Sequence, residues 1–216
     1  MKISAAIFDM DGTLTDSMSY WANICSMLVR FCGKTPAEDF DKRMKGKTFE
    51  QVTEVFDKEY GIRMTKREVN DAMNAIIEDI YMTVVIPKPG VTALLERFKT
   101  DGVKMCVATM TDLELAEKLL VRLGLRDYFS KIFTCAMVGD GKEKPTIYNA
   151  SLEHLGTKRE ETPVFEDALY AIRTAKAAGF PVVAIYEPTF EDDQTKIREL
   201  ADVYIEDYRL DCHKLR

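Results

Sequence analysis

Short apolar runs recur along this chain, and they limit its possible folds more than any other feature of the sequence. Their apolar residues are mostly consecutive, whereas a strand with one wet face would alternate apolar and polar residues. Such runs favour strands of a parallel sheet that is buried on both faces. The runs are Ile3–Phe8, Val103–Ala108, Ile132–Ala136, Pro163–Phe165, Val182–Ile185 and Val203–Ile205.

Helical patterns separate these runs from residue 91 onward. Apolar residues recur every three or four positions around Leu94, Leu119 and Ile147, as they do on one face of a helix. Strands and helices that alternate in this way predict an α/β core with a doubly wound parallel sheet. Thr111 and Thr157 each precede a glutamate by three positions, so we expect capping boxes at both threonines.

The segment 17–86 breaks the alternation, because it contains helical patterns without strands between them. Apolar stripes with helical spacing run through residues 21–32, 49–60 and 69–84. These stripes predict a small helical bundle inserted after the first strand.

Local signals also predict where the insert's helices begin and where the chain leaves it. Thr35 and Thr65 each precede a glutamate by three positions, which is typical of a helix start. Pro87 and Pro89 favour an extended connection back to the core. We therefore expect two domains. Residues 1–16 and 87–216 form an α/β core, and residues 17–86 form the inserted helical domain.

The composition narrows the function classes. The chain has 216 residues, of which 46% are hydrophobic, and it carries a net charge of −6, so we expect no nucleic-acid partner. No apolar stretch approaches the length of a membrane span, and Asp9 comes too early for a secretory signal, so we expect no membrane partner. The five cysteines and two histidines lack zinc-site spacing. We expect a cytoplasmic protein that is a monomer or a weak dimer.

Two carboxylates follow the first predicted strand directly. Asp9 and Asp11 are two residues apart, and Gly12 after them lets the backbone turn sharply. Ligands of doubly wound sheets bind outside the carboxyl ends of the strands, where these acids lie. Carboxylates can hold Mg²⁺ or attack a phosphoryl group. An ordinary acidic turn is the alternative interpretation of these residues.

Polar residues end three later runs as well. Thr109 and the exposed backbone after it at Met110 could cradle a phosphate, although a plain helix cap explains Thr109 equally well. Lys142 lies in a polar glycine-containing loop that binds phosphate oxygens or is simply solvated. Glu166 and Asp167 repel each other unless a cation neutralises them, which indicates a metal site. The alternative interpretation is that Asp167 caps the next helix.

The motifs at these strand ends, taken together, resemble those of the haloacid dehalogenase (HAD) superfamily of phosphohydrolases. The resemblance is to the subgroup with a helical cap after the first motif, and it covers essentially the whole chain. The first motif, D-x-D-G-T-L-x-D-S, is intact at residues 9–17, and Thr109 matches the second. The lysine motif matches residues 141–148, and the acidic pair followed by A-A-G matches residues 166–179.

The resemblance implies a HAD-like Rossmannoid core and a role for each motif residue. Asp9 is then the nucleophile that forms an aspartyl-phosphate, and Asp11 is the general acid and base. Thr109 and Lys142 stabilise the phosphoryl oxygens. The remaining implied role is a Mg²⁺ site, formed by Asp9, the carbonyl of Asp11, Asp167 and possibly Glu166.

The chain departs from the family pattern near two of these motifs. Ala168 replaces the serine that usually follows the acidic pair. Glu143 and Thr146 replace a proline and an aspartate of the lysine motif, so Lys142 and Lys144 compete for one role. Lys142 is favoured because it lies six residues before Tyr148, the aromatic residue of the motif.

The resemblance leaves the substrate and the reaction type open. The expected function is a Mg²⁺-dependent phosphatase acting on a small phosphorylated metabolite, with Lys45 and Gly46 of the cap facing the substrate. One alternative is a phosphomutase similar to β-phosphoglucomutase, which carries an arginine where this chain has Phe49. Another is a non-catalytic protein that binds a phosphorylated ligand, which would need no nucleophile.

Overall fold

The computed structural model describes residues 2–45 and 47–215. The chain divides into a core unit, Met1–Asp16 with Ile86–Arg216, and a cap unit, Ser17–Val85. The cap unit therefore ends one residue earlier than the boundary at residue 86 that the sequence predicted. Among the described residues, no helix combines the length and the apolar character needed to cross a bilayer.

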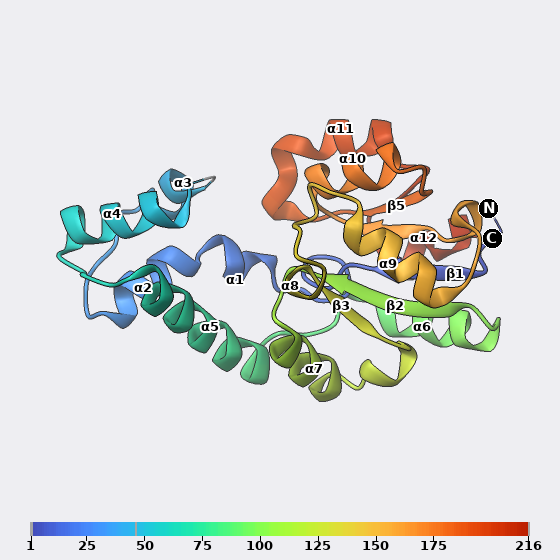
Figure 1. Cartoon of the computed structure of the whole chain (residues 1–216), viewed down its shortest axis with the longest axis horizontal. Helices are drawn as coiled ribbons and strands as arrows, with labels where there is room; N and C mark the ends of the chain where they lie inside the picture. The colour runs from blue at the N-terminus through green and yellow to red at the C-terminus, as the bar shows by residue number, and fades with distance from the viewer. Residues whose placement is uncertain (1, 46, 216) are drawn as a thin grey trace. The chain divides into compact units, whose positions relative to one another are not determined.

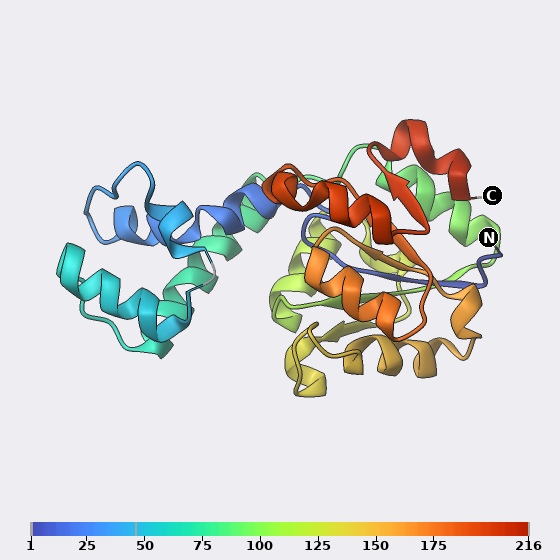
Figure 2. The ribbon, with the colours of Figure 1, turned by 90° about the horizontal axis from the view of Figure 1, so that it is seen from above.

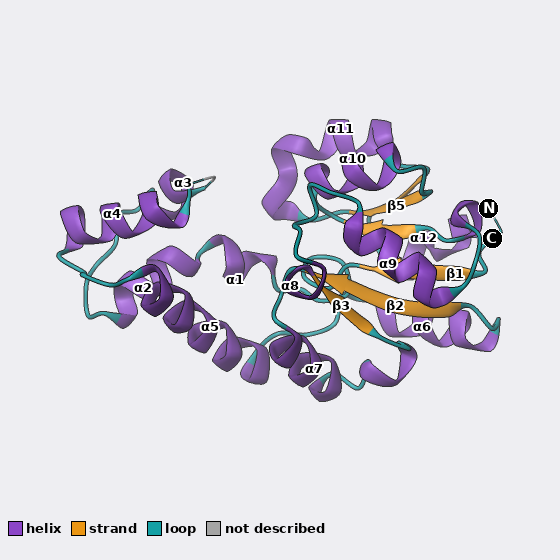
Figure 3. Cartoon of the chain, viewed as in Figure 1, coloured by secondary structure: helices purple, strands orange, loops and turns teal. Residues whose placement is uncertain are grey.

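The core unit contains a fully parallel sheet (Figures 1 and 3). Within the described residues the sheet has six strands, in the order β3-β2-β1-β4-β5-β6. The predicted doubly wound parallel sheet is thus confirmed. The strands are β1 (Ala5–Phe8), β2 (Lys104–Thr109), β3 (Ile132–Thr134), β4 (Val164–Glu166), β5 (Val182–Ile185) and β6 (Val203–Ile205).

The strand order places a switch point between β1 and β4. From β1 the chain proceeds through β2 to β3 on one side, and then crosses to β4 and continues outward to β6. At such a point the loops at the carboxyl ends of the two central strands diverge, which leaves a crevice for a ligand. The residues that follow β1 and β4 are therefore the ones that the fold brings to a ligand site.

Helices follow the strands of the core. They are α6 (Val91–Thr100), α7 (Leu113–Arg122), α8 (Cys135–Val138), α9 (Thr146–Leu155), α10 (Leu169–Ala177), α11 (Gln194–Leu200) and α12 (Tyr208–Asp211). Short 3₁₀ segments precede or follow several of them. These segments are η1 (Arg126–Tyr128), η2 (Arg159–Glu161), η3 (Pro188–Asp193) and η4 (Cys212–Leu215).

Successive residues of the central strands serve the two faces of the sheet. Ala5 and Ile7 of β1 belong to a buried cluster with residues of α9, α10 and α11. Phe8 points to the opposite face, where its ring stacks on that of Phe165 with centroids 4.3 Å apart and also contacts Phe98 of α6. Figure 2 shows α12 beside α6. Helices on both faces explain why the strand sequences are apolar without alternation.

The cap unit is a bundle of helices with its own apolar core. Its helices are α1 (Met18–Ala22), α2 (Ile24–Phe31), α3 (Phe40–Met44), α4 (Phe49–Tyr60) and α5 (Lys66–Thr83). Helix α5 packs against α2 and α4. The ring of Phe40 contacts the rings of Phe56 and Tyr60. The apolar stripes of the sequence thus face one another.

Helix starts in the cap unit follow the local signals only in part. The Thr65 hydroxyl accepts a hydrogen bond from the Glu68 amide, and the Glu68 carboxylate accepts one from the Thr65 amide, so the capping box predicted at Thr65 is confirmed. The start predicted at Thr35 is wrong, because α3 begins at Phe40. The stripe at residues 21–32 is divided at Asn23, which ends α1 and precedes α2. Burial of Phe40 outweighs the weaker cap signal at Thr35.

Local signals in the core unit were also misleading at three places. Thr157 does not cap a helix, because its hydroxyl pairs with that of Thr162 at 2.8 Å. The strand expected at Ile132–Ala136 ends at Thr134, whose hydroxyl accepts a hydrogen bond from the Met137 amide and starts α8. The capping box expected at Thr111 is absent as well, since Asp112 precedes α7 and makes no side-chain cap bond.

The two connections to the cap unit are paired with each other. Thr15 forms an antiparallel bridge with Pro87, and the Asp16 amide donates to the Ile86 carbonyl at 3.0 Å. The Lys88 amide donates to the Leu14 carbonyl at 2.9 Å. These bonds hold the outgoing and returning chain side by side at the edge of the core unit.

Candidate active site

The loop after β1 presents Asp9 at the switch point. The Asp9 amide donates to the Phe165 carbonyl of β4 at 2.9 Å, so the parallel pairing continues one residue beyond the strand. The chain then folds back, because the Leu14 and Thr15 amides both donate to the Met10 carbonyl. Gly12 has a φ of +87° in this turn, a conformation that glycine adopts without strain. The predicted turn at Gly12 is thus present.

Lys142 reaches the same point from the loop before α9. Its side chain is only 2% exposed, and its Nζ donates to Asp9 Oδ1 and, at 3.0 Å, to Glu166 Oε1. Lys144, in contrast, is 68% exposed and pairs with Asp140. Of the two lysines that the sequence offered, Lys142 is therefore the one in contact with the acidic residues.

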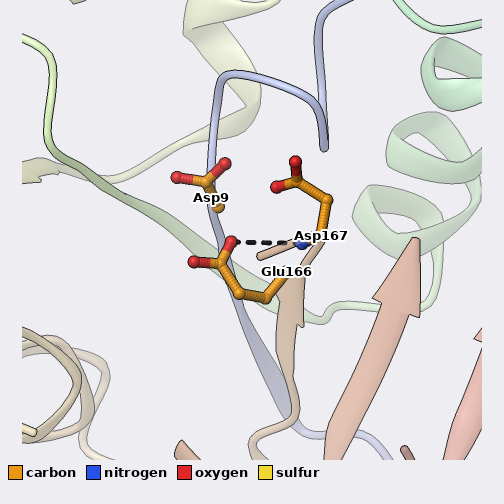
Figure 4. Close-up of side chains that lie close together, drawn as sticks. All are labelled: Asp9, Glu166 and Asp167. Carbon is orange, nitrogen blue, oxygen red and sulfur yellow. Dashed lines mark hydrogen bonds between the residues drawn. The ribbon is translucent and has the colours of Figure 1, made fainter. Parts of the chain in front are cut away.

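Glu166 and Asp167 lie at the end of β4, and both are buried. The Asp167 amide donates to Glu166 Oε2 at 3.3 Å, as Figure 4 shows. Asp167 Oδ1 accepts a hydrogen bond from the Thr13 hydroxyl at 3.1 Å. Among the described residues, buried Asp167 Oδ2 has no hydrogen-bond partner. Ala168, and not Asp167, occupies the cap position of α10, so the helix-cap interpretation of Asp167 fails.

Asp9, Glu166 and Asp167 form one compact cluster. Each contributes a carboxylate oxygen, and the three oxygens lie within 4.8 Å of one another (Figure 4). Burial, together with the neighbouring carboxylates, raises the pKa of Asp9 and Asp167 and raises that of Glu166 to about 8. Burial alone would lower the pKa of Lys142, but the charges of Asp9 and Glu166 outweigh it and raise that pKa. One lysine thus faces three acidic groups.

The cluster fits a hard divalent cation. A carboxylate oxygen such as Asp167 Oδ2, buried without a donor, is costly unless a cation or a proton satisfies it. Oxygen ligands from carboxylates are those that Mg²⁺ prefers. A dication would also offset the burial and the mutual repulsion that raise the pKa of these three groups. The donor set is therefore suited to Mg²⁺.

Asp11 and Thr109 are joined through a residue that the sequence analysis misassigned. The Thr111 hydroxyl donates to Asp11 Oδ2 at 2.7 Å, and the Thr111 amide donates to Thr109 Oγ1 at 3.0 Å. Thr111 therefore orients Asp11, which is why its hydroxyl does not cap α7. This network places the second acid of the first motif beside the end of β2.

The remaining predicted site residues are not all assembled with the cluster. Met110 directly follows Thr109 and is mostly exposed. Lys45 is exposed at the end of α3 in the cap unit, so its substrate role stays a prediction. Gly46 lies outside the described residues.

Two residues that support the cluster were missed from the sequence. Thr13 donates to Asp167, and its position within D-x-D-G-T was a signal that could have indicated this role. The hydroxyl of Tyr208, in α12, donates to the Thr13 carbonyl at 3.0 Å. Nothing in the sequence near Tyr208 indicates this contact, because it depends on how α12 packs in the folded core.

Comparison with known proteins identifies the family of the chain. The sequence profile of the family described as haloacid dehalogenase-like hydrolase matches residues 6–185. The chain belongs to this family, and it is a hydrolase with phosphatases among its relatives.

Two curated relatives and one solved structure show the range of the similarity. A phosphorylated carbohydrates phosphatase of Thermotoga maritima is 29% identical over 177 residues, which is 82% of each chain. The β-phosphoglucomutase of Bacillus subtilis is 27% identical and covers 94% of this chain and 93% of its own. The crystal structure of a putative β-phosphoglucomutase from Thermotoga maritima superposes with a TM-score of 0.83 at 26% identity, covering 100% of this chain and 99% of that one.

Proposed function

We propose that this protein is a Mg²⁺-dependent phosphatase that hydrolyses a small phosphorylated metabolite through a phosphorylated Asp9. The observation that carries the proposal is the buried cluster of Asp9, Glu166 and Asp167, with Lys142 among them, at the switch point of the sheet. A protein that only bound a phosphorylated ligand would have no need for this many buried acids beside an anionic group. A nucleophile and its metal site require them.

The first step is attack by an Asp9 carboxylate oxygen on phosphorus. The new Asp9–phosphorus bond forms as the bond to the alcohol oxygen breaks, and Asp11 gives that oxygen its proton. In the second step Asp11 takes a proton from a water molecule, which displaces Asp9 and releases inorganic phosphate. The hydrogen bond from Thr111 keeps Asp11 oriented for both proton transfers.

Lys142, Thr109 and the metal ligands supply the electrostatic part of this proposal. The Lys142 ammonium and the Thr109 hydroxyl stabilise charge on the phosphoryl oxygens. Asp9, Asp167 and the neighbouring Glu166 would hold Mg²⁺, which reduces the repulsion between the carboxylate nucleophile and the anionic phosphate when it is bound. Whether Glu166 contacts the ion directly or through water does not alter this charge balance.

The relatives suggest the substrate class. The phosphatase of Thermotoga maritima is named for phosphorylated carbohydrates, and we propose a phosphorylated carbohydrate as the substrate of this chain. A cytoplasmic location and a monomeric or weakly dimeric state stay predictions.

A phosphomutase is the second candidate, favoured by the similarity to the β-phosphoglucomutase of Bacillus subtilis. A mutase must hold the second phosphate of a bisphosphate with cationic groups. The resemblance places an arginine for this task where the chain has Phe49, and an aromatic ring cannot pair with phosphate as a guanidinium does. Lys47 offers only a single point charge nearby.

A panel of phosphorylated sugars, glycolate and nucleotides distinguishes these functions by phosphate release. We expect phosphate release by the wild type to require Mg²⁺ and to cease with EDTA. We expect the Asp9→Asn variant to release no phosphate. Conversion of β-glucose 1-phosphate to glucose 6-phosphate faster than phosphate release would favour the mutase. Full activity in metal-free buffer would contradict the metal site.

A further inference from the structure

Two large side chains, one from each neighbour of β1, meet beside the acidic cluster. Met110 directly follows β2, and Tyr170 is in the first turn of α10, after β4. The Tyr170 hydroxyl contacts Met110 Sδ at 3.0 Å. Neither contact partner is part of the proposed catalytic machinery, apart from the backbone of Met110, which the sequence analysis assigned to phosphate binding.

The position of this contact follows from the strand order. Strands β2 and β4 flank β1, so their ends are about 10 Å apart and the end of β1 lies between them. A contact between Met110 and Tyr170 therefore spans the end of the strand that carries Asp9. Tyr170 also follows Glu166 and Asp167 of the cluster by only four and three residues, so the chain keeps it near them.

The exposure of the pair contrasts with the burial of the cluster. Met110 is 56% exposed and Tyr170 is 41% exposed, whereas Asp9, Lys142, Glu166 and Asp167 are all buried. In-line displacement places the leaving oxygen on the side of phosphorus opposite to Asp9. The buried groups can surround the phosphoryl group, and the organic part of the ester must then extend away from them, toward exposed side chains.

We propose that Tyr170, with Met110, forms the wall of the core unit that contacts the organic part of the phosphoester and helps to select it. This inference rests on the proposed phosphatase function. A tyrosine presents an apolar ring face and a polar hydroxyl at its edge. The matching ligand is a polyhydroxylated carbon skeleton, with C–H groups that pack on the ring and a hydroxyl that reaches the phenol oxygen.

The test compares substrates that differ in their organic part. The best-hydrolysed sugar phosphate of the panel has a large one, and acetyl phosphate has a very small one. For Tyr170→Ala we expect KM for the sugar phosphate to rise about tenfold, the size of effect that one aromatic contact gives. We expect kcat to change less than about twofold. The inhibition constant of inorganic phosphate and kcat/KM for acetyl phosphate stay at wild-type values.

Two further variants serve as controls. One separates the role of the Tyr170 ring from that of its hydroxyl, and the other shows the effect of removing an exposed apolar side chain elsewhere. Tyr170→Phe keeps the ring, so it retains more of the affinity for the sugar phosphate than Tyr170→Ala does. Val121→Ala removes an apolar side chain that is 63% exposed on α7, about two turns from the strand ends, and leaves every constant unchanged.

The outcomes are distinguishable. Equal weakening of sugar phosphate, acetyl phosphate and inorganic phosphate by Tyr170→Ala would mean a structural role and overturn the inference. Wild-type kinetics of Tyr170→Ala on every substrate would overturn it as well. Wild-type enzyme that releases no phosphate from any substrate with Mg²⁺ would instead remove the proposed function, and this inference with it.

Discussion

Lys142 is the only cation in contact with the acidic cluster among the described residues, and it is almost completely buried. Its ammonium offsets part of the repulsion between Asp9 and Glu166, and in the proposed reaction it also faces the phosphoryl oxygens. A buried charge pair is costly to break on one side, because the remaining charge is left without compensation. Lys142 therefore affects both the resting site and the reaction.

Replacing the two neighbouring lysines tests this assignment. We expect Lys142→Ala to lower kcat by about 100-fold or more, the usual effect of removing one donor to a developing negative charge. We expect Lys144→Ala to change kcat less than about twofold, because the Lys144 side chain pairs with Asp140 at the surface. Steady-state kinetics of both variants with Mg²⁺ provide the measurement. The opposite order of effects would contradict the assignment.

Some site residues could be predicted from sequence motifs, whereas others depend on contacts between distant parts of the chain. Asp9, Glu166 and Asp167 could be found because a parallel sheet brings strand ends together, and because their motifs are specific. Thr111 was misassigned, because its local sequence favours a helix cap while its hydroxyl contacts Asp11, 100 residues away in the chain. Tyr170 was missed, since an exposed aromatic residue in a helix has no local signature.

At the scale of the elements, α12 contacts the loop after β1, which the sequence did not indicate. Tyr208 in α12 donates to the Thr13 carbonyl, and the Thr13 hydroxyl donates to Asp167. The neighbouring Arg209 backbone lies so close to Gly90 that a Cβ there would be 2.7 Å from the Arg209 nitrogen. Helix α12 is thus tightly held against the start of α6, and Tyr208 extends from it to the loop after β1.

Removing the Tyr208 hydroxyl tests whether this chain of contacts orients the metal ligand. We expect Tyr208→Phe to weaken Mg²⁺ binding up to about fivefold, the equivalent of one ordinary hydrogen bond of about 1 kcal/mol. Calorimetric titration with Mg²⁺ gives the dissociation constant. Tyr81→Phe is the matched control, because that buried hydroxyl accepts from Trp21 Nε1 in the cap unit. Equal Mg²⁺ affinity of wild type and Tyr208→Phe would show that Tyr208 has no such role.

Element boundaries show where sequence patterns were sufficient. The runs at Val182–Ile185 and Val203–Ile205 match β5 and β6 residue for residue. Proline or acidic residues bound these runs in the sequence, at Pro181, Asp202 and Glu206. Helix starts were less predictable. The capping box at Thr48 was missed, and the one expected at Thr35 does not exist, since cap signals are weak compared with the burial of an aromatic residue such as Phe40.

At the scale of the whole molecule, the charge distribution leads us to expect that the effect of metal on stability depends on pH. The chain has 36 acidic and 30 basic residues, so its overall charge does not attract phosphates. The acidic cluster adds a local effect. Its carboxyl groups have a raised pKa in the folded protein, about 8 for Glu166. At a pH between the unfolded and the folded pKa, and without metal, these groups therefore keep protons that the same groups lose in the unfolded chain.

This difference predicts how stability changes with pH. Because the pKa values of these carboxyl groups are higher in the folded than in the unfolded protein, protonation of the cluster stabilises the fold. This contribution to the free energy of unfolding is fully present below about pH 4 and is lost as the pH rises toward about 8. In the proposed site Mg²⁺ binds the deprotonated carboxylates, so we expect its stabilising effect to grow over the same range. We expect the rise in Tm on adding Mg²⁺ to be small at pH 5 and larger at pH 8, by thermal unfolding with Mg²⁺ or EDTA.

Two variants show whether the cluster is responsible. Glu166→Gln removes one of the groups that titrate, so its Mg²⁺-induced rise in Tm should depend less on pH. Glu206→Gln removes an exposed carboxylate that pairs with Arg198, and it should behave as wild type. A Tm rise that is equal at both pH values in wild type, or larger at pH 5, would contradict this account of the cluster.

The most direct test of the central claim is to find the phosphoryl group on Asp9. Wild type and Asp9→Asn are mixed with Mg²⁺ and a hydrolysed phosphomonoester radiolabelled at phosphorus, quenched in acid within one turnover, and digested. Asp9→Asn should remain folded, with Tm in EDTA at or above that of wild type, because Lys142 keeps Glu166 as a partner while one of the mutually repelling buried carboxylates is gone. We predict label on the wild-type peptide that contains Asp9 and none on Asp9→Asn. The account would be contradicted if wild type hydrolysed the substrate without carrying label, or if both proteins were labelled equally.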